Sequence, residues 1–310
     1  MFRINDLILL LVLFLSMLAA IFFPGFGSHF QPYLLYLMMF LLVLSLLSIR
    51  IGDVWKILRG SYKSIFLFSL FKIIVLPVIL YFLFLYLLPS YAVAALLLTG
   101  ISTGVTAPFI SNIVRANTAL VLVMVVLSSI MAPFTLPLLI KILMAQSTNI
   151  SLLSMIRMLC LVIFIPVLFV EGLRLLFPGL LEKAKGREFP FHLAIVALMN
   201  LGVFSKYADY FRHNPVTIVM ATLVAIALSC IYMIAGLLFL RKDRMENQIA
   251  AAVSMGNMNN VLVIVFSSQF FGPLEPTVAA MYTIPFFGLI LPLRYYQRWR
   301  EKKLACHILN

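Results

Sequence analysis

Apolar stretches of about twenty residues follow one another along almost the whole chain, and this is the length that a helix needs to cross a bilayer core. The polar connections between them are short, and several contain the proline or glycine that is typical of a helix boundary. The pattern predicts an all-α polytopic membrane protein. We expect ten transmembrane helices, at Leu7–Phe23, Pro32–Ser48, Ile65–Leu88, Ala92–Ile113, Ala119–Met144, Leu152–Leu176, Pro190–Lys206, Val216–Leu240, Gln248–Phe270 and Thr277–Leu293.

Composition leads to the same class of protein. Hydrophobic residues make up 64% of the 310 positions and charged residues only 11%, which excludes a soluble globular protein. The first apolar stretch follows a short polar start, as it would in a signal peptide. It has no small-residue cleavage site and is followed directly by further spans, so we expect it to be retained as a helix.

Lysines and arginines are concentrated on alternate connections, and cytoplasmic connections of membrane proteins carry an excess of them. If the N-terminus is cytoplasmic, the outside connections carry only Lys206 and Arg212. The inside segments then carry Arg3, Arg50, Lys56, Arg59, Lys63, Arg115, Lys183, Lys185, Arg187, Arg241, Lys242, Arg244, Arg294, Arg298, Arg300, Lys302 and Lys303. The alternation predicts cytoplasmic N- and C-termini. Membrane topology therefore explains the net charge of +13, and nucleic-acid binding is not needed to explain it.

Two of the predicted spans contain residues that interrupt a helix. The fourth span carries Gly100, Gly104 and Pro108, and the ninth carries the segment 255–260, Met-Gly-Asn-Met-Asn-Asn. Glycine frees the backbone, proline removes an N–H donor, and polar groups at bilayer depth often mark a substrate path. Proline and glycine are also common in ordinary membrane helices, so a single interrupted span would be interpreted as a simple kink.

The spacing of the two interrupted spans argues for more than kinks. They are five helices apart, and because five is odd the two halves of the chain insert in opposite orientations. Inverted repeats with interrupted helices at matching positions are typical of secondary transporters. We therefore predict two inverted five-helix repeats, at residues 1–147 and 148–310, with discontinuous helices 4 and 9 that cross each other.

No constellation of side chains suggests catalysis or a cofactor. The three cysteines, Cys160, Cys230 and Cys306, are too widely spaced for a metal site or a thioredoxin-like motif, and the four histidines are scattered. We predict no enzyme activity, no metal and no cofactor.

At the interrupted spans the chain resembles the bile acid:sodium symporter family, whose fourth and ninth helices cross at unwound midpoints. The segment 128–137, Ser-Ser-Ile-Met-Ala-Pro-Phe-Thr-Leu-Pro, is similar to the family's serine-then-two-prolines pattern in helix 5. The segment 115–120, Arg-Ala-Asn-Thr-Ala-Leu, is similar to its Arg-Gly-Asn-x-Ala-Leu turn, and 258–260, Met-Asn-Asn, resembles its Met-Gln-Asn. The resemblance implies a divergent bacterial-type member in the inner membrane. It also implies a moving core domain of spans 3–5 and 8–10 and a panel domain of spans 1, 2, 6 and 7.

The chain departs from this family at the positions that bind sodium. In the family a glutamate five residues before the helix-9 asparagine is a sodium ligand, and the matching position before Asn260 is Met255. A Ser-Asn pair at the helix-4 break is replaced by Pro-Phe at 108–109, and two hydroxyl positions in helix 5 fall on Val121 and Val125. The only acidic residue inside an apolar run, Glu171, is expected to pair with Arg174 three residues later.

A lysine takes the place of a further family position in helix 3. The family has a glutamine five residues before a proline, and that position, five before Pro77, is Lys72. It lies roughly 12 Å into the span when counted from Ser64 at a rise of about 1.5 Å per residue. The side chain could reach toward the headgroups, but a charge at this depth costs several kcal/mol, about 2.5 to 3.5 on insertion scales. We predict that Lys72 faces the bundle and replaces the ion by a tethered positive charge.

Several intramembrane residues are candidates for contact with a substrate or ion. Asparagine side chains offer both a carbonyl and an N–H₂ group, although helix–helix hydrogen bonding is their ordinary use. The hydroxyl residues near the break in span 4 could line it or simply pack, and residues after Pro108 could cap the resumed helix. The candidate binding residues are Lys72, Thr103, Thr106, Pro108, Asn112, Gly256, Asn257, Asn259 and Asn260.

Together these features predict a secondary active transporter that works by alternating access. Its expected partners are a small organic anion and the lipid bilayer, with Lys72 as a fixed cation and with proton or counter-anion coupling in place of sodium. Two alternatives stay open: a sodium-dependent symporter of bile acid-like molecules or carboxylates, and a non-transporting membrane sensor that kept the fold. An arsenite-type carrier is disfavoured, because it requires a cysteine in span 4 and an acidic residue in span 9.

Overall fold

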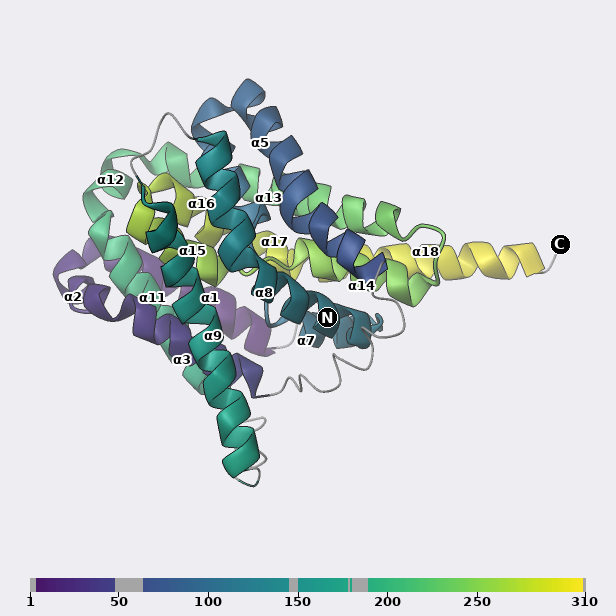
Figure 1. Cartoon of the computed structure of the whole chain (residues 1–310). Coiled ribbons are helices and arrows are strands. Elements are labelled where there is room, and N and C mark those ends of the chain that lie inside the picture. Colours follow the sequence, from purple (N-terminus) through teal and green to yellow (C-terminus); the bar gives the residue numbers. More distant parts are fainter. Residues whose placement is uncertain (1–3, 48–63, 145–149, 178, 180–188, 309–310) are drawn as a thin grey trace.

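The fold is all-helical over the residues that the structure describes. The computed structural model describes residues 4–47, 64–144, 150–177, 179 and 189–308 (Figure 1). Its main helices are α1 (Ile4–Phe22), α2 (Pro24–Ser28), α3 (Leu34–Leu46), the π-helical turn η2 (Phe71–Val75), α5 (Leu76–Leu87), α6 (Ala92–Thr99), α7 (Ala107–Ile113), α8 (Thr118–Leu143), α9 (Leu152–Leu176), α11 (Phe189–Lys206), α12 (Ala208–His213), α13 (Pro215–Phe239), α14 (Met245–Gly256), α15 (Asn260–Phe270), α16 (Leu274–Met281), α17 (Thr283–Gly288) and α18 (Ile290–Ile308). Short 3₁₀ turns, η1 (Gln31–Tyr33) and η3 (Pro89–Tyr91), precede α3 and α6.

The chain is a multi-pass integral membrane protein. Six helical stretches of the described residues are long and apolar enough to cross a membrane: Pro24–Leu46, Ser64–Leu87, Thr118–Leu143, Leu152–Leu176, Pro215–Phe239 and Leu274–Arg300. Shorter apolar helices include Pro190–Lys206 and Asn260–Phe270. Every predicted span overlaps a helix or a run of short helices among the described residues. The count of ten crossings and the inverted arrangement of the halves stay predictions.

Prolines explain where two of the spans depart from a regular α-helix. In span 3 the π-helical turn at Lys72 ends just before Pro77, which has no N–H to give to the carbonyl of Ile73. The last predicted span, Thr277–Leu293, lies within the apolar helical stretch Leu274–Arg300. It consists of α16, α17 and α18, and Pro285 follows the first of its two interruptions.

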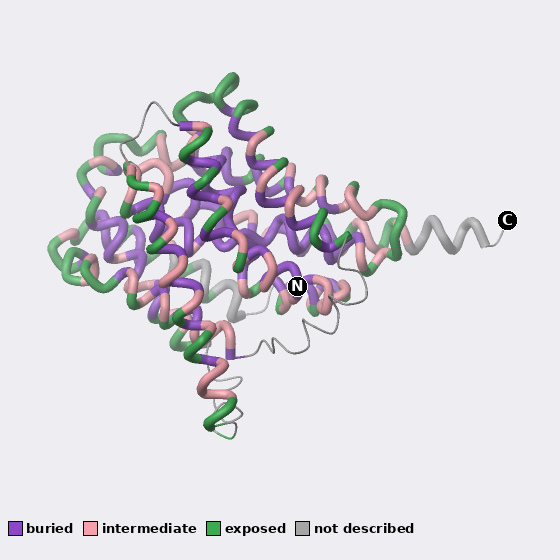
Figure 2. The backbone as a smooth tube through the Cα atoms, viewed as in Figure 1, coloured by how far each residue is buried: buried purple, intermediate pink, exposed green. Residues whose placement is uncertain are grey.

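Two groups of helices pack among themselves. In one group α13 lies against α14 and α16, α5 and α16 lie against α6, and α8 lies against η2, α7 and α14. In the other α1 and α2 lie against α11, and α3 lies against both α9 and α11. The groups meet where α8 contacts α9 and where α15 contacts α3 and α11. Figure 2 shows that the buried residues concentrate in the middle of this helical body. Large apolar side chains such as Leu168 and Leu175 are exposed.

Close packing in the first group depends on small residues. A Cβ atom added at Gly236 on α13 would lie 2.6 Å from Cα of Ala252, so only glycine permits this approach of α13 to α14. Residues 248–260 are all buried, which makes α14 and the start of α15 the centre of the fold. The segment singled out by its amides in the sequence therefore lies in the interior.

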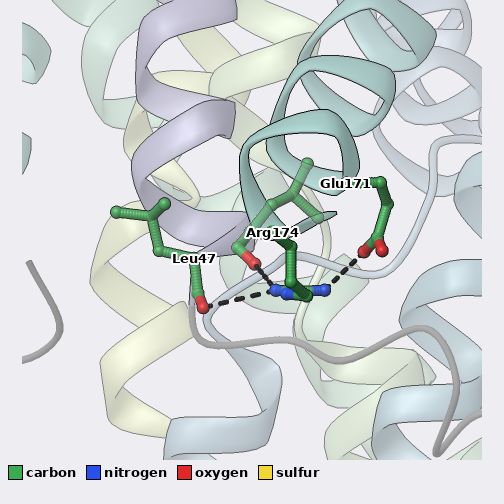
Figure 3. A network of polar contacts seen from close by, with 4 residues as sticks. Leu47, Glu171 and Arg174 are labelled. Atoms are coloured by element: carbon green, nitrogen blue, oxygen red, sulfur yellow. Dashed lines mark hydrogen bonds and ion pairs between the residues drawn. The ribbon is translucent and has the colours of Figure 1, made fainter. Parts of the chain in front are cut away.

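The predicted pair of Glu171 and Arg174 is confirmed and has a structural role (Figure 3). The Arg174 guanidinium binds the Glu171 carboxylate and donates to the carbonyls of Leu46 and Leu47 at 3.4 and 3.5 Å. These carbonyls end α3, where the last turn has no partners within the helix. The pair thus ties α9 to α3. The basic segments that set the predicted orientation at Arg3, at 50–63 and at 183–187 lie outside the described residues.

Candidate substrate and ion site at the helix crossing

The two interrupted spans meet at their breaks. Residues 100–106 separate α6 from α7, and residues 257–259 separate α14 from α15. The breaks run antiparallel and are joined at Thr103 and Met258. Gly104 N–H donates to the carbonyl of Asn257 at 2.7 Å, and Asn259 N–H donates to the carbonyl of Ser102 at 3.0 Å. Each break therefore satisfies backbone groups that unwinding freed in the other, which an apolar bilayer core demands.

A glycine allows this approach of two backbones. A Cβ added at Gly104 would lie 3.2 Å from the carbonyl oxygen of Met258 and 3.5 Å from that of Asn257. The contact of 3.2 Å is tighter than a Cβ normally makes, so a larger residue at Gly104 would push the two breaks apart. The close approach of the two breaks thus explains why span 4 carries a glycine at position 104.

Lys72 points into the crossing and not toward the headgroups. Its side chain is fully buried, and Nζ donates to Oγ1 of Thr103 at 2.7 Å. Thr103 Oγ1 in turn donates to the carbonyl of Ser254 at 2.9 Å, and Thr103 N–H donates to Oγ of Ser128 at 2.9 Å. Thr103 therefore links span 3, the first break, α8 and α14. In the part of the chain that the structure describes, Lys72 has no ion-pair partner.

Two buried tyrosines, neither among the predicted binding residues, complete the crossing. The Tyr232 hydroxyl donates to the carbonyls of Lys72 and Thr99, each at 3.1 Å, and the Tyr282 hydroxyl donates to the carbonyl of Gly256 at 2.6 Å. Thr99 ends α6 and Gly256 ends α14, so both hydroxyls satisfy the free carbonyls of a helix end. A tyrosine in the middle of an apolar span was the available signal, because a buried hydroxyl usually finds a partner.

The three predicted asparagines differ in the hydrogen bonds of their side chains. Asn259 Oδ1 accepts from Leu262 N–H at 3.3 Å and caps α15. Asn260 Nδ2 donates to the carbonyl of Ala279 at 3.2 Å and to Oγ1 of Thr283 at 2.9 Å, which is helix–helix hydrogen bonding. Asn257 is fully buried, and neither Nδ2 nor Oδ1 has a partner among the described residues. Of the three, only Asn257 makes no side-chain hydrogen bond among the described residues.

The remaining predicted residues of span 4 lie along α7. Thr106 is exposed at its N-cap position, and Pro108 lies in its first turn, where a missing N–H is harmless. Asn112 lies in its last turn, where Oδ1 accepts from Oγ1 of Thr118 at 2.7 Å. The expectation that residues after Pro108 cap the resumed helix was therefore wrong, because α7 already begins at Ala107. The structure brings Lys72, Thr103, Gly256 and the asparagines of span 9 together, and leaves Asn112 at the far end of α7.

The crossing offers hydrogen-bonding side chains and the buried Lys72. Within the described ranges, no three His, Cys, Asp or Glu side chains come together as metal ligands would. Met255, at the position where the resemblance predicts a sodium-binding carboxylate, is fully buried. The groups at the site are therefore the buried Lys72 side chain, hydroxyls and an amide.

Comparison with known proteins identifies the class to which this fold and crossing belong. Residues 32–214 match the sequence model of the Sodium Bile acid symporter family, which is a family of transporters and not of enzymes. The chain belongs to this family, as the resemblance of its interrupted spans predicted. The matched residues include Lys72 and the first break and end before α14.

The chain is also similar to an individual plant protein. The "Probable sodium/metabolite cotransporter BASS1, chloroplastic" of Arabidopsis thaliana is 28% identical over 239 residues, which cover 73% of this chain and 58% of the plant protein. The chain thus matches a little over half the length of this curated relative.

Proposed function

We propose that this protein is a secondary carrier for a small organic anion, and that Lys72 provides a fixed positive charge where related carriers hold sodium. The observation that carries the proposal is the hydrogen bond of 2.7 Å from the buried Lys72 ammonium to Thr103 at the crossing of the two breaks. Family membership and the plant relative's description as a sodium/metabolite cotransporter support transport of a metabolite. An anionic substrate follows from the sign of the buried charge.

The same charge disfavours sodium binding at the crossing. A sodium ion about 4 Å from an ammonium is repelled by about 4 kcal/mol at an effective dielectric constant of about 20, which weakens its affinity by about a thousandfold. No carboxylate compensates, since Lys72 forms no ion pair among the described residues and position 255 is a methionine. We therefore expect transport without sodium, by uniport, by exchange or with a proton.

Alternating access requires two parts that move against each other. We assign spans 3–5 and 8–10 to the moving core and spans 1, 2, 6 and 7 to the panel. The packing of α5, α6, α8, α13, α14 and α16 into one group, and of α1, α3, α9 and α11 into another, supports this division. The crossing lies wholly within the proposed core, so it would travel with that domain.

The proposed topology has two inverted repeats, at residues 1–147 and 148–310, and cytoplasmic termini in a bacterial inner membrane. The broken pairs α6–α7 and α14–α15 support it, because they occur five spans apart. The alternation of basic residues along the sequence supports the orientation. Cysteine labelling from the two sides of the membrane tests it.

Purified protein in liposomes tests the function directly. We expect uptake or counterflow of a labelled small organic anion that is equal with sodium and with choline outside. Lys72→Gln should abolish this flux, whereas Lys141→Gln, which removes an exposed charge near the end of α8, should preserve it. Sodium-dependent uptake by the wild type would instead support the symporter. Binding of organic anions without flux would support a sensor that kept the fold.

A further inference from the structure

Four buried polar atoms beside the Lys72–Thr103 link have no hydrogen-bond partner among the residues that the structure describes. They are Oγ of Ser102, Oγ of Ser254, and Nδ2 and Oδ1 of Asn257. All three residues are fully buried. Buried polar side chains in proteins almost always have a partner, so four such atoms on the two interrupted spans require an explanation.

The backbone contacts of the crossing bring these three residues next to Thr103 and Gly104. Ser102 precedes Thr103, and its carbonyl accepts from Asn259 N–H at 3.0 Å. The carbonyl of Ser254 accepts from Thr103 Oγ1 at 2.9 Å, and the carbonyl of Asn257 accepts from Gly104 N–H at 2.7 Å. Each of these residues is thus adjacent to Thr103 in the sequence or hydrogen-bonded through its backbone to Thr103 or Gly104, and Thr103 is the residue that Lys72 binds.

The charge of Lys72 makes this group of atoms suitable for an anion. An ammonium has three N–H donors, and one of them is used by Thr103. The two serine hydroxyls and the asparagine N–H₂ are further donors. A buried ammonium without a counterion is strongly disfavoured, and no carboxylate within the described residues pairs with it.

We propose that the crossing binds one small monovalent inorganic anion of the chloride class, held by Lys72 together with the free donors of Ser102, Ser254 and Asn257. A single-atom ion suits the site, because its donors are enclosed by the two breaks and the side chains that bear them are fully buried. An acceptor-only ion also suits a set that consists mainly of donors.

The inorganic anion would be the counter-anion in an exchange with the organic anion. This consequence rests on the proposed function. The organic anion and the inorganic anion would compete for Lys72, so the carrier would return with the inorganic anion after it releases the organic one. The exchange moves one negative charge in each direction. It therefore needs no sodium ion and no net movement of charge.

The thermal stability of purified protein in sodium-free detergent solution tests the site. We expect the unfolding temperature to rise with chloride and to saturate, as for binding to a single site of the folded state, in comparison with sulfate at matched ionic strength. Bromide should act like chloride. Lys72→Gln should remove this response, and Ser254→Ala or Asn257→Ala should weaken the apparent chloride affinity by about tenfold or more, which corresponds to the loss of a hydrogen bond to a charged group.

Matched controls separate binding from general salt effects, which strengthen or weaken burial in any protein. Lys206→Gln removes a different lysine, which lies outside the crossing and donates to the backbone carbonyl of Ser268. Ser267→Ala removes a buried hydroxyl that donates within α15. Both variants should keep the wild-type response to chloride. A response that is unchanged in Lys72→Gln, or an equal response to all salts, would overturn the proposal.

A second measurement covers the case in which Lys72→Gln does not fold. Broadening of the chloride NMR signal by wild-type protein, reversed by bromide and weakened in Ser254→Ala, would support the site, and its absence would overturn the proposal. The two hypotheses can also fail separately. Stabilisation by organic anions without any by chloride would overturn only this inference, whereas chloride binding without binding or flux of organic anions would overturn only the proposed function.

Discussion

Thr103 Oγ1 lies 2.7 Å from Nζ of Lys72 and accepts a hydrogen bond from it, while the same hydroxyl donates to the carbonyl of Ser254 at 2.9 Å. The hydroxyl thus lies between the buried Lys72 side chain and the carbonyl of Ser254 near the end of α14. A valine has nearly the same shape but neither accepts nor donates. This relationship makes Thr103 the residue whose side chain most directly joins the lysine to the crossing.

Thr103→Val should destabilise the protein strongly, because it removes the acceptor of a buried ammonium. Hydrogen bonds to charged groups contribute about 1.5 to 3 kcal/mol, and the loss here includes the second bond to Ser254. Thr103→Ser keeps the hydroxyl and should remain within about 1 kcal/mol of the wild type. Unfolding temperatures in detergent measure both. Equal stability of the valine and serine variants would show that the hydrogen bonds of Thr103 contribute little.

Gly104→Ala should loosen the crossing. The added Cβ would lie 3.2 Å from the carbonyl oxygen of Met258, so the two breaks must separate by a few tenths of an ångström. Overpacking of this kind costs about 1 to 3 kcal/mol. We expect a lower unfolding temperature and weaker binding of organic anions.

Gly172→Ala is the matched control for this change. A Cβ at Gly172 on α9 would meet nothing within 4 Å, and alanine is favoured over glycine inside a helix by about 1 kcal/mol. This variant should be as stable as the wild type or slightly more stable. If both alanine variants behaved alike, the close approach of the breaks at Gly104 would not limit stability.

Much of the fold could be predicted because its signals are local. The predicted span at Leu152–Leu176 has the same bounds as α9, since an apolar run and its flanking residues determine both ends of a helix. The breaks were also visible, because Gly104 and the amides of 257–260 interrupt their spans. The choice of Lys72 as a bundle-facing residue followed from the free-energy cost of a charge at its depth.

The individual roles of the site residues could not be predicted, because their partners are distant in the sequence. Asn260 was expected to face the substrate, yet its amide binds Thr283 on the next span. The Tyr282 hydroxyl binds the carbonyl of Gly256, which only the packing of α16 against α15 makes reachable. Periodicity and composition determine where helices lie, but they do not determine which of several amides is left with free hydrogen bonds.

Lys206 and Tyr207 join the two groups of helices, and their loss should open the contact between them. Lys206 Nζ donates to the carbonyl of Ser268 at 2.8 Å, and the Tyr207 hydroxyl lies 3.4 Å from the carbonyls of Ser268 and Phe271. The lysine and tyrosine lie at the end of α11, and the carbonyls lie at the end of α15. The free carbonyls of a helix C-terminus attract a cation, so this contact holds α15 against the proposed panel.

A cysteine reporter at Ser268, which is 2% exposed, can measure this opening. In a background without the native cysteines, Lys206→Met with Tyr207→Phe should speed its labelling by a membrane-impermeant maleimide about tenfold, as expected when a charged hydrogen bond is lost. Arg212→Met is the control, since its guanidinium donates within the panel to the carbonyl of Ile21 at 2.6 Å. Equal labelling in all three proteins would mean that Lys206 and Tyr207 do not hold the contact closed.

A double substitution tests whether the tethered charge replaces sodium. Lys72→Gln removes the repulsive ammonium, and Met255→Glu supplies a carboxylate at the position where the family resemblance implies a sodium ligand. A sodium site requires oxygen ligands and a charge that compensates the ion, and neither single change provides both. We therefore expect the unfolding temperature of the double variant to rise with sodium and not with choline, while both single variants and the wild type show no difference between these cations. The corresponding gain in the free energy of unfolding should follow RT ln(1 + [L]/Kd), which is about 1.4 kcal/mol at a sodium concentration ten times the dissociation constant. A double variant that folds and still fails to distinguish sodium from choline would contradict the idea that Lys72 occupies the place of the ion.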